Sequence, residues 1–434
     1  MTTDLQTIRN ATVPLTLAGV PAGFLPWLSA DLARLAGAGG RAVLIASDEA
    51  AMRAVGDAAA FFAPELDILH FPAWDCLPYD RSSPSLRATS ERLATLNALQ
   101  RKHDKPQLLV TTVNAVTQRT LTPFRVRQLV ASLSPGERID MERLARLLQA
   151  NGYSRTETVH DPGEYAVRGG IVDLFPAGDE QGLRLDFFGD EIETVRQFDP
   201  ASQRTTGTIK GFTLLPASET LLDEESVKRF RSRYRELFGA NATGDPLYQA
   251  VSDGRRIAGL DHWLPLFEER LETLFDHLGD RDIIVREAGV SGAADARFEA
   301  VADYYDNRQR AQSSDVGSYR PLKPETLYLP RQEWEQLIAQ HPIHLATPCR
   351  EPGSASVVDF EVEAPRDFAP ERAQNANVYE AVAAHLADLR RARRKVVLAS
   401  YSKGARERLT GLLADHGVKK LELVESWQEA LGTS

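Results

Sequence analysis

Residues 183–198 read LRLDFFGDEIETVRQF, with two alternating runs of residues on either side of Gly189-Asp190. A Gly-Asp pair between two such runs predicts an antiparallel hairpin with strands at residues 184–188 and 191–198. Because side chains alternate between the two faces of a strand, the first run separates into two sets. These are Leu183, Leu185 and Phe187 on one face, and Arg184, Asp186 and Phe188 on the other. If the leucines face the core, Phe188 is a large aromatic group on the outer face, beside charges of both signs.

The hairpin belongs to a segment that differs from the sequence on both sides of it. Residues 151–215 keep the period-two alternation, broken by Gly and Pro turns, which predicts a small antiparallel β-rich domain. The first 125 residues instead alternate strand-like and helix-like patterns, which is typical of a parallel α/β sheet. In that part we expect strands at 13–18, 42–46, 66–71 and 107–112, and helices at 26–36 and 90–99.

The α/β pattern returns after the antiparallel segment. An apolar stripe over residues 260–278, ending at Gly279, predicts a long helix, and residues 283–285 predict a buried strand. EPGSAS, residues 351–356, has the composition of a linker. Beyond it we expect a helix at 378–394, a strand at 396–400 and a helix at 403–416. The expected organisation is therefore an α/β domain at 1–125 and 216–350, an inserted domain at 126–215, and a small α/β domain at 351–434.

Composition restricts the classes of function. The chain has 434 residues and a formal net charge of −10, which argues against nucleic-acid binding over its whole surface. Its two cysteines lie far apart and form neither a zinc site nor a disulfide framework. We find no candidate metal ligands or catalytic residues. With no apolar run long enough for a membrane span and no signal-peptide pattern, we expect a cytoplasmic protein.

The first strand–turn–helix occupies the place of a phosphate-binding loop, whose pattern is G-x-x-x-x-G-K-[ST]. The matching run here, residues 18–25, contains Gly19 and Gly23, but Phe24 replaces the lysine and Leu25 replaces the magnesium-binding hydroxyl residue. Pro21 also removes a backbone N–H donor. Either this is a degenerate nucleotide site or an unrelated Gly/Pro turn.

A second segment repeats this theme. A strand ending in Asp-Glu holds magnesium and activates water in such ATPases, whereas residues 283–285 here run into Arg286-Glu287. Arginine would therefore stand at the place of the metal-binding aspartate. The missing lysine and hydroxyl residue, or the arginine in place of aspartate, could each be a coincidence. Both changes together, in the order in which these motifs occur along an ATPase chain, favour a degenerate ATPase.

The outer face of the hairpin has the composition of a protein-binding surface. Tyr165 and Val167 alternate with Ala166 and Arg168, which brings a further arginine to a strand surface. Exposed arginine and aromatic groups are typical of protein-interface hot spots. Replacing such outward side chains is expected to change folding stability by less than about 0.5 kcal/mol. The alternative is a solvated polar sheet face with Phe188 covered by a loop.

Several long motifs resemble one protein family. GYSRTETVHDPGEYAVRGGIVDLFPAG (152–178) and LRLDFFGDEIETVRQFDPASQRT (183–205) resemble the second domain of bacterial transcription-repair coupling factors, the Mfd family, a domain that the excision-repair protein UvrB shares. Motifs that resemble the first domain of the coupling factors are HFPAWDCLPYDRSSPS (70–85) and LLVTTVNAVTQRTLTP (108–123). GLDHWLPLF (259–267) and PLKPETLYLP (321–330) continue the match.

The resemblance implies a degenerate P-loop, RecA-like α/β domain that carries an inserted UvrA-binding domain, followed by a small third domain. It places UvrA contacts on Arg168, Arg184 and Phe188, with Asp186 and Glu191 as neighbours. Residues 75–90 leave no room for the hairpin with which UvrB engages damaged DNA. The chain would then be a non-catalytic N-terminal module without cofactors. In a full-length family member, motor domains would use ATP and Mg, and RNA polymerase and double-stranded DNA would be further partners. The alternative is a divergent ATP-dependent helicase or DNA-binding module.

Overall fold

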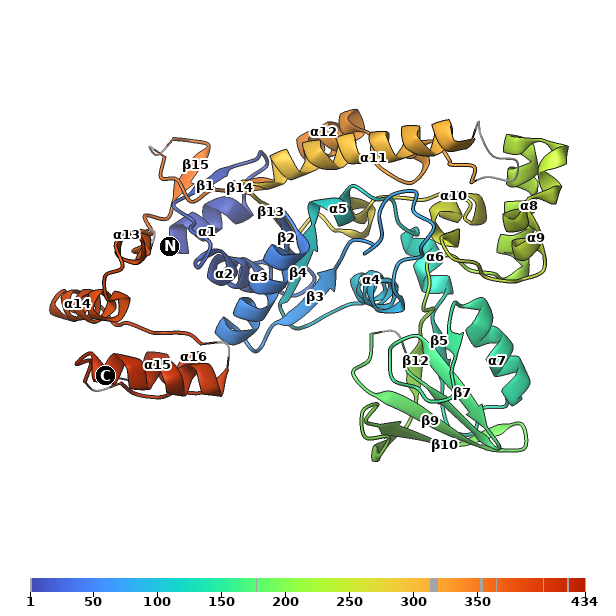
Figure 1. The fold of residues 1–434 in the computed structure, drawn as a ribbon, viewed down its shortest axis with the longest axis horizontal. Helices are drawn as coiled ribbons and strands as arrows, with labels where there is room; N and C mark the ends of the chain where they lie inside the picture. Colours follow the sequence, from blue (N-terminus) through green and yellow to red (C-terminus); the bar gives the residue numbers. More distant parts are fainter. Residues whose placement is uncertain are drawn as a thin grey trace. The chain divides into compact units, whose positions relative to one another are not determined.

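The computed structural model describes residues 2–176, 178–312, 319–351, 354–363, 365–400, 402–419 and 421–433. They form two compact units, residues 1–360 and residues 361–434 (Figure 1). No helix within the described ranges combines the length and the apolar character needed to cross a bilayer.

A seven-stranded parallel sheet forms the centre of the first unit, with strand order β15-β1-β14-β13-β2-β4-β3. Its strands are β1 (Thr16–Ala18), β2 (Arg41–Ala46), β3 (Asp67–Phe71), β4 (Gln107–Thr112), β13 (Ile283–Glu287), β14 (His344–Ala346) and β15 (Val357–Asp359). Every residue of β2 and β4 is buried, as expected for strands with helices on both faces. The predicted parallel α/β fold is confirmed.

Helices cover both faces of this sheet (Figure 1). They include α1 (Thr2–Arg9), α2 (Leu25–Ala36), α3 (Glu49–Phe62), α4 (Leu86–Leu99), α5 (Val113–Val116), α6 (Pro123–Gln128), α11 (Val290–Gln312) and α12 (Arg331–Gln340). Leu44 packs into one apolar cluster with residues of α2 and α3, whereas Val43 and Ile45 pack into another with residues of α4 and α11. Successive side chains of β2 thus contribute to two apolar clusters, one on each face of the sheet.

The parallel sheet extends past the expected linker at 351–356. Val357 and Val358 of β15 pair with Thr16 and Leu17 of β1, and Val358 completes the cluster beneath α2. The chain thus adds β15 as the outer strand of the sheet before it enters the second unit. The second unit therefore begins at residue 361, ten residues after the expected boundary.

The predicted long helix over residues 260–278 is wrong. The segment contains two 3₁₀ turns, Leu260–Trp263 and Leu274–His277, with α10 (Leu264–Phe267) and extended residues between them. Glu272 exchanges two backbone hydrogen bonds with Thr120, of 2.8 and 3.0 Å, which holds the chain extended. The apolar residues of the stripe are nevertheless largely buried, so the pattern predicted burial correctly but not conformation.

The inserted segment forms a six-stranded sheet with order β11-β10-β9-β8-β7-β6. Its strands are β6 (Ser154–Arg155), β7 (Glu164–Arg168), β8 (Ile171–Leu174), β9 (Gly182–Phe188), β10 (Glu191–Phe198) and β11 (Thr205–Ile209). All pairs are antiparallel except β6 with β7. Leu144 and Leu148 of α7 (Met141–Ala150) pack with Leu183, Leu185 and Val195, which confirms the predicted core face. The predicted hairpin across Gly189-Asp190 is confirmed as well.

Other elements complete the first unit. A small ladder joins β5 (Ala131–Leu133) to β12 (Phe212–Leu214) where the chain enters and leaves the insert. The helices that follow are α8 (Glu224–Phe238) and α9 (Pro246–Ser252), with 3₁₀ turns at Ala240–Gly244 and Pro324–Thr326.

The second unit contains α13 (Ala369–Ala373), α14 (Val378–Arg391), α15 (Lys403–Asp415) and α16 (Trp427–Gly432). A small core of Leu386, Leu413 and Val418 holds the two longer helices together. The two predicted helices are confirmed. The predicted strand at 396–400 is wrong, because these residues form no ladder within the described part of the unit and Leu398 stays 41% exposed.

Candidate docking face

The insert presents one side of its sheet away from the leucine core. We call this side the outer face and define it by Arg168, Ile171, Asp173, Arg184, Asp186, Phe188, Thr194 and Arg196. The strand register arranges it in rows. One row runs from Asp173 to Arg184 and Arg196, and the next from Arg168 to Ile171, Asp186 and Thr194.

Arg184 forms a two-pronged ion pair with Asp173 on the neighbouring strand. Its Nε and Nη2 atoms donate to the two carboxylate oxygens at 2.7 and 2.9 Å, and its guanidinium lies 5.0 Å from the ring centre of Phe198. The side chains of Arg184 and Asp173 are only 18% and 4% exposed. The hydrogen bond to Asp173 raises the pKa of Arg184 further above its usual range. Arg184 thus lies on the outer face, as the alternation predicts, and a nearly buried acid holds it in a fixed orientation.

Asp186 is held in a similar way by β10. Arg196 donates to its two oxygens at 2.8 and 2.6 Å, and the Thr194 hydroxyl donates at 2.5 Å. Partial burial acts to raise the pKa of Asp186, but the hydrogen bonds from Arg196 and Thr194 outweigh it and lower the pKa below its usual value. A β-bulge between Ile192 and Thr194 sets the register that brings Thr194 opposite Asp186.

Phe188 is the large apolar group of this face. It ends β9 just before Gly189, and it is 80% exposed, so it is not covered by a loop. The nearby Glu191 carboxylate lies 3.7 Å from the Nε of Arg138. Single exposed apolar side chains are normal on protein surfaces, so the candidate is the combination of this ring with the ordered arginines beside it, which is typical of interface hot spots.

Arg168 does not lie on a strand next to that of Arg184. The strand β8 separates β7 from β9, so Ile171 stands between Arg168 and Asp186. The Arg168 guanidinium donates to the backbone oxygen of Glu157 at 3.1 and 2.5 Å. The structure thus places Arg184, Asp186 and Phe188 along one strand, with Arg168 at the edge of the same face.

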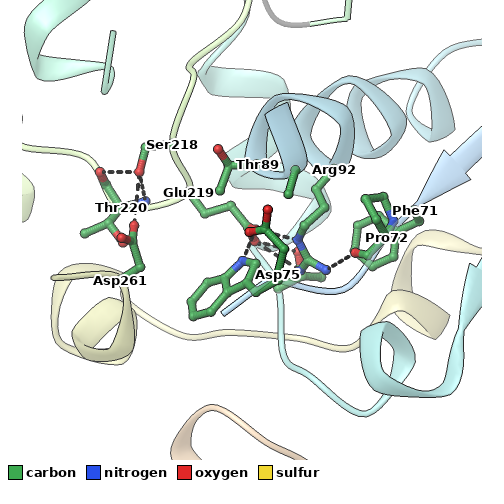
Figure 2. Close-up of polar contacts among 12 residues, drawn as sticks. Phe71, Pro72, Asp75, Thr89, Arg92, Ser218, Glu219, Thr220 and Asp261 are labelled. Carbon is green, nitrogen blue, oxygen red and sulfur yellow. Dashed lines mark hydrogen bonds and ion pairs between the residues drawn. The ribbon is translucent and has the colours of Figure 1, made fainter. Parts of the chain in front are cut away.

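The segment that leaves the insert is anchored in the α/β domain by Glu219 (Figure 2). Arg92 Nε donates to Glu219 at 2.6 Å and the Trp74 indole N–H donates at 2.8 Å, while Arg92 Nη1 donates to the backbone oxygen of Pro72 at 2.8 Å. The side chains of Arg92 and Glu219 are 0% exposed, and the Arg92 guanidinium lies 4.2 Å from the ring centre of Phe71.

A second polar cluster lies beside this anchor. The Ser218 hydroxyl accepts from Arg256 at 3.0 Å, and lies 3.3 Å from an oxygen of Asp261, to which it donates (Figure 2). Sequence reasoning missed both clusters, because isolated charged residues far apart in the chain carry no pattern.

The loop after β1 uses its backbone donors internally. The N–H groups of Gly19 and Val20 donate to the backbone oxygens of Cys349 and Thr347 at 3.0 and 2.9 Å. Those of Phe24 and Leu25 both donate to Pro21, at 2.8 and 3.2 Å. The Phe24 ring packs against Phe360 at 5.7 Å between ring centres, and Leu25 is buried.

The strand end at Arg286-Glu287 is also engaged. Arg286 donates to the Ser291 hydroxyl at 2.6 Å, and Glu287 accepts from the backbone and hydroxyl of Ser47 at 2.9 and 3.1 Å. The strand β14 lies between β1 and β13, so the loop after β1 and the strand end at Arg286-Glu287 are not on neighbouring strands. Among the residues that the structure describes, no group of three His, Cys, Asp or Glu side chains is placed to hold a metal ion.

Comparison with known proteins identifies relatives of this chain. Residues 131–219 match the family model of the UvrB interaction domain. The chain is 37% identical over 279 residues to the transcription-repair-coupling factor of Haemophilus influenzae, which covers 64% of this chain and 24% of that protein. The Escherichia coli factor is 34% identical over 292 residues, covering 67% and 25%, and the Myxococcus xanthus factor 37% over 265 residues, covering 57% and 22%.

The chain is homologous to the N-terminal region of transcription-repair-coupling factors. It spans about a quarter of the length of the coupling factors from Haemophilus influenzae and Escherichia coli. Within the chain, the matched UvrB interaction domain coincides with the antiparallel insert and ends at Glu219, the buried anchor residue.

Proposed function

We propose that this chain recruits UvrA to transcription-coupled repair, and that the outer face of the insert is the docking surface. The observation that carries the proposal is Phe188, which stands 80% exposed on a domain that matches the UvrB interaction domain. Binding would bury its ring and exclude water from the neighbouring charge pairs, an arrangement typical of interface hot spots.

The charge pairs give the face its specificity. Arg184 and Asp186 are already oriented by Asp173 and by Arg196, so little side-chain entropy is lost when a partner binds. The Arg184 side chain, which is 18% exposed, can receive a carboxylate of UvrA, while Asp186 and Glu191 can receive cations.

A binding measurement tests this proposal. Immobilised UvrA is titrated with the chain, with Phe188→Ala, and with Phe124→Ala as a matched control, since Phe124 is 63% exposed but lies on α6 outside the outer face. We expect saturable binding that Phe188→Ala weakens and Phe124→Ala leaves unchanged. Equal weakening by both variants, or no binding at all, would overturn the proposal.

We further propose that this chain has no ATPase function. Phosphate-binding loops hold their ligand with backbone N–H groups, a lysine and a hydroxyl. Here four backbone N–H groups of the loop already donate to backbone oxygens, those of Gly19, Val20, Phe24 and Leu25. No lysine follows Gly23. Calorimetry with Mg-ATP is expected to show no binding, and micromolar affinity would contradict the proposal. In the full-length protein, ATP and Mg would act in separate motor domains, with RNA polymerase and double-stranded DNA as further partners.

A further inference from the structure

A small cavity lies on the α/β domain, between α11 and the segment that leads into α12. Its volume is about 170 Å³, and its walls are mostly apolar. They include Thr117, Phe298, Val301, Tyr328, Leu329 and Pro330. An apolar cavity of about 150 Å³ is large enough for one benzene molecule, so this one can take a single ring or a branched aliphatic group.

Arg297 brings a positive charge to these apolar walls. Its Nε atom is buried without a hydrogen-bond partner, and its guanidinium lies 5.2 Å from the ring centre of Tyr328. Within the described residues, no carboxylate forms an ion pair with it. Burial lowers the pKa of Arg297 below the usual arginine value, because the charged form loses hydration without gaining an anion.

The second arginine in the wall differs from the first. Arg331 is paired with Asp295, and it lies 5.3 Å from the ring centre of Phe298. Glu325 also lines the cavity, but its side chain is exposed to solvent. A partly desolvated cation that lacks a protein anion is unfavourable unless a ligand supplies one.

We propose that this cavity binds a small organic carboxylate whose apolar body is about the size of a benzene ring. The apolar body would lie against Val301, Leu329 and Tyr328, and the carboxylate would pair with Arg297 through the two-pronged geometry that a guanidinium favours. The carboxylate could belong to a free small acid or to the C-terminus of a peptide that ends in an apolar residue. This site is separate from the outer face and goes beyond the proposed UvrA recruitment.

The probe for a free acid is benzoate, with uncharged benzamide as its control, and N-acetyl-phenylalanine stands for a peptide C-terminus. Binding is followed by saturation-transfer NMR and calorimetry on the whole chain. We expect saturable benzoate binding and at least tenfold weaker binding of benzamide. A tighter fit of N-acetyl-phenylalanine than of benzoate would assign the site to a peptide end, and the reverse to a free acid.

Variants connect the binding to the cavity. Arg297→Gln is expected to weaken benzoate binding at least tenfold, whereas Arg331→Gln, which removes a paired arginine from the same wall, changes it little. Glu325→Gln should bind benzoate at least as tightly as the unchanged chain, because a nearby negative charge is removed. No saturable binding up to about 10 mM, or equal binding by the chain and Arg297→Gln, would overturn the proposal. Thermal melting serves as the folding control, and each of the three variants should unfold in one cooperative transition like the unchanged chain.

Discussion

Two arginines of this molecule are held in nearly the same way but differ in their exposure to solvent. Arg92 and Arg184 each donate hydrogen bonds from two guanidinium nitrogens to one carboxylate, and each lies over a phenylalanine ring. The Arg92–Glu219 pair is fully buried and receives further hydrogen bonds, while 18% of the Arg184 side chain remains exposed on the outer face. The same local motif fixes the insert to its support in one place and orients a candidate docking residue in the other.

The strongest test of this difference is at the buried pair. Arg92→Met leaves the Glu219 carboxylate uncompensated in the core, so the free energy of unfolding should fall by about 3–5 kcal/mol. The free energy of unfolding is measured by chemical denaturation. The double variant Arg92→Met/Glu219→Gln removes both charges and should recover part of the loss. A single variant within about 1 kcal/mol of the unchanged chain would show that the pair does not hold the insert.

Arg184→Ala should have a smaller effect on stability and an additional effect on binding. Asp173 loses its partner, but water reaches this site from the outer face, so we expect a loss of about 2–3 kcal/mol in unfolding free energy. This exceeds what the sequence suggests for an outward side chain. UvrA affinity should also fall. If Arg184→Ala melts like the unchanged chain, the ion pair with Asp173 is not formed in solution.

Phe188→Ala should separate binding from stability. We expect UvrA affinity to fall by about 2 kcal/mol, or roughly thirtyfold, because an exposed anchor is lost. The unfolding free energy should change by less than about 0.5 kcal/mol, since the ring contributes little to the core. Leu185→Ala, its neighbour on the core side, should instead lose about 2–5 kcal/mol. Similar melting of both variants would mean that Phe188 is buried in solution.

The sequence predicts most elements that follow a regular pattern, and it misses conformations that depend on distant contacts, as at residues 260–278. Hydrophobic alternation places Leu185 in the core and Phe188 outside, and the Gly-Asp pair locates the hairpin. The partner of Asp186 could not be predicted, because the bulge at Ile192 shifts the register and brings Arg196 within reach. The pairing of Glu219 with Arg92 joins residues 127 positions apart, which no local pattern encodes.

Arg168 should have the smallest effect of the outer-face residues. It lies at the edge of the face with an exposed side chain and donates to a backbone oxygen, so it keeps most of its hydration. Among the residues that the structure describes, no carboxylate forms an ion pair with it. Charges at the rim of an interface act mainly on the association rate and its salt dependence. Arg168→Ala should therefore weaken UvrA binding by about 1 kcal/mol or less, chiefly through slower association at low ionic strength. Arg155→Ala is the matched control. Arg155 is also exposed, but in the strand register it stands opposite Tyr165, whose side chain packs on the core side of the sheet, so Arg155 does not belong to the outer face. The measurement is the association rate of each variant with UvrA at two salt concentrations. If Arg168→Ala changes only the dissociation rate, or weakens binding as much as Phe188→Ala, Arg168 lies inside the interface and the docking surface extends over β7.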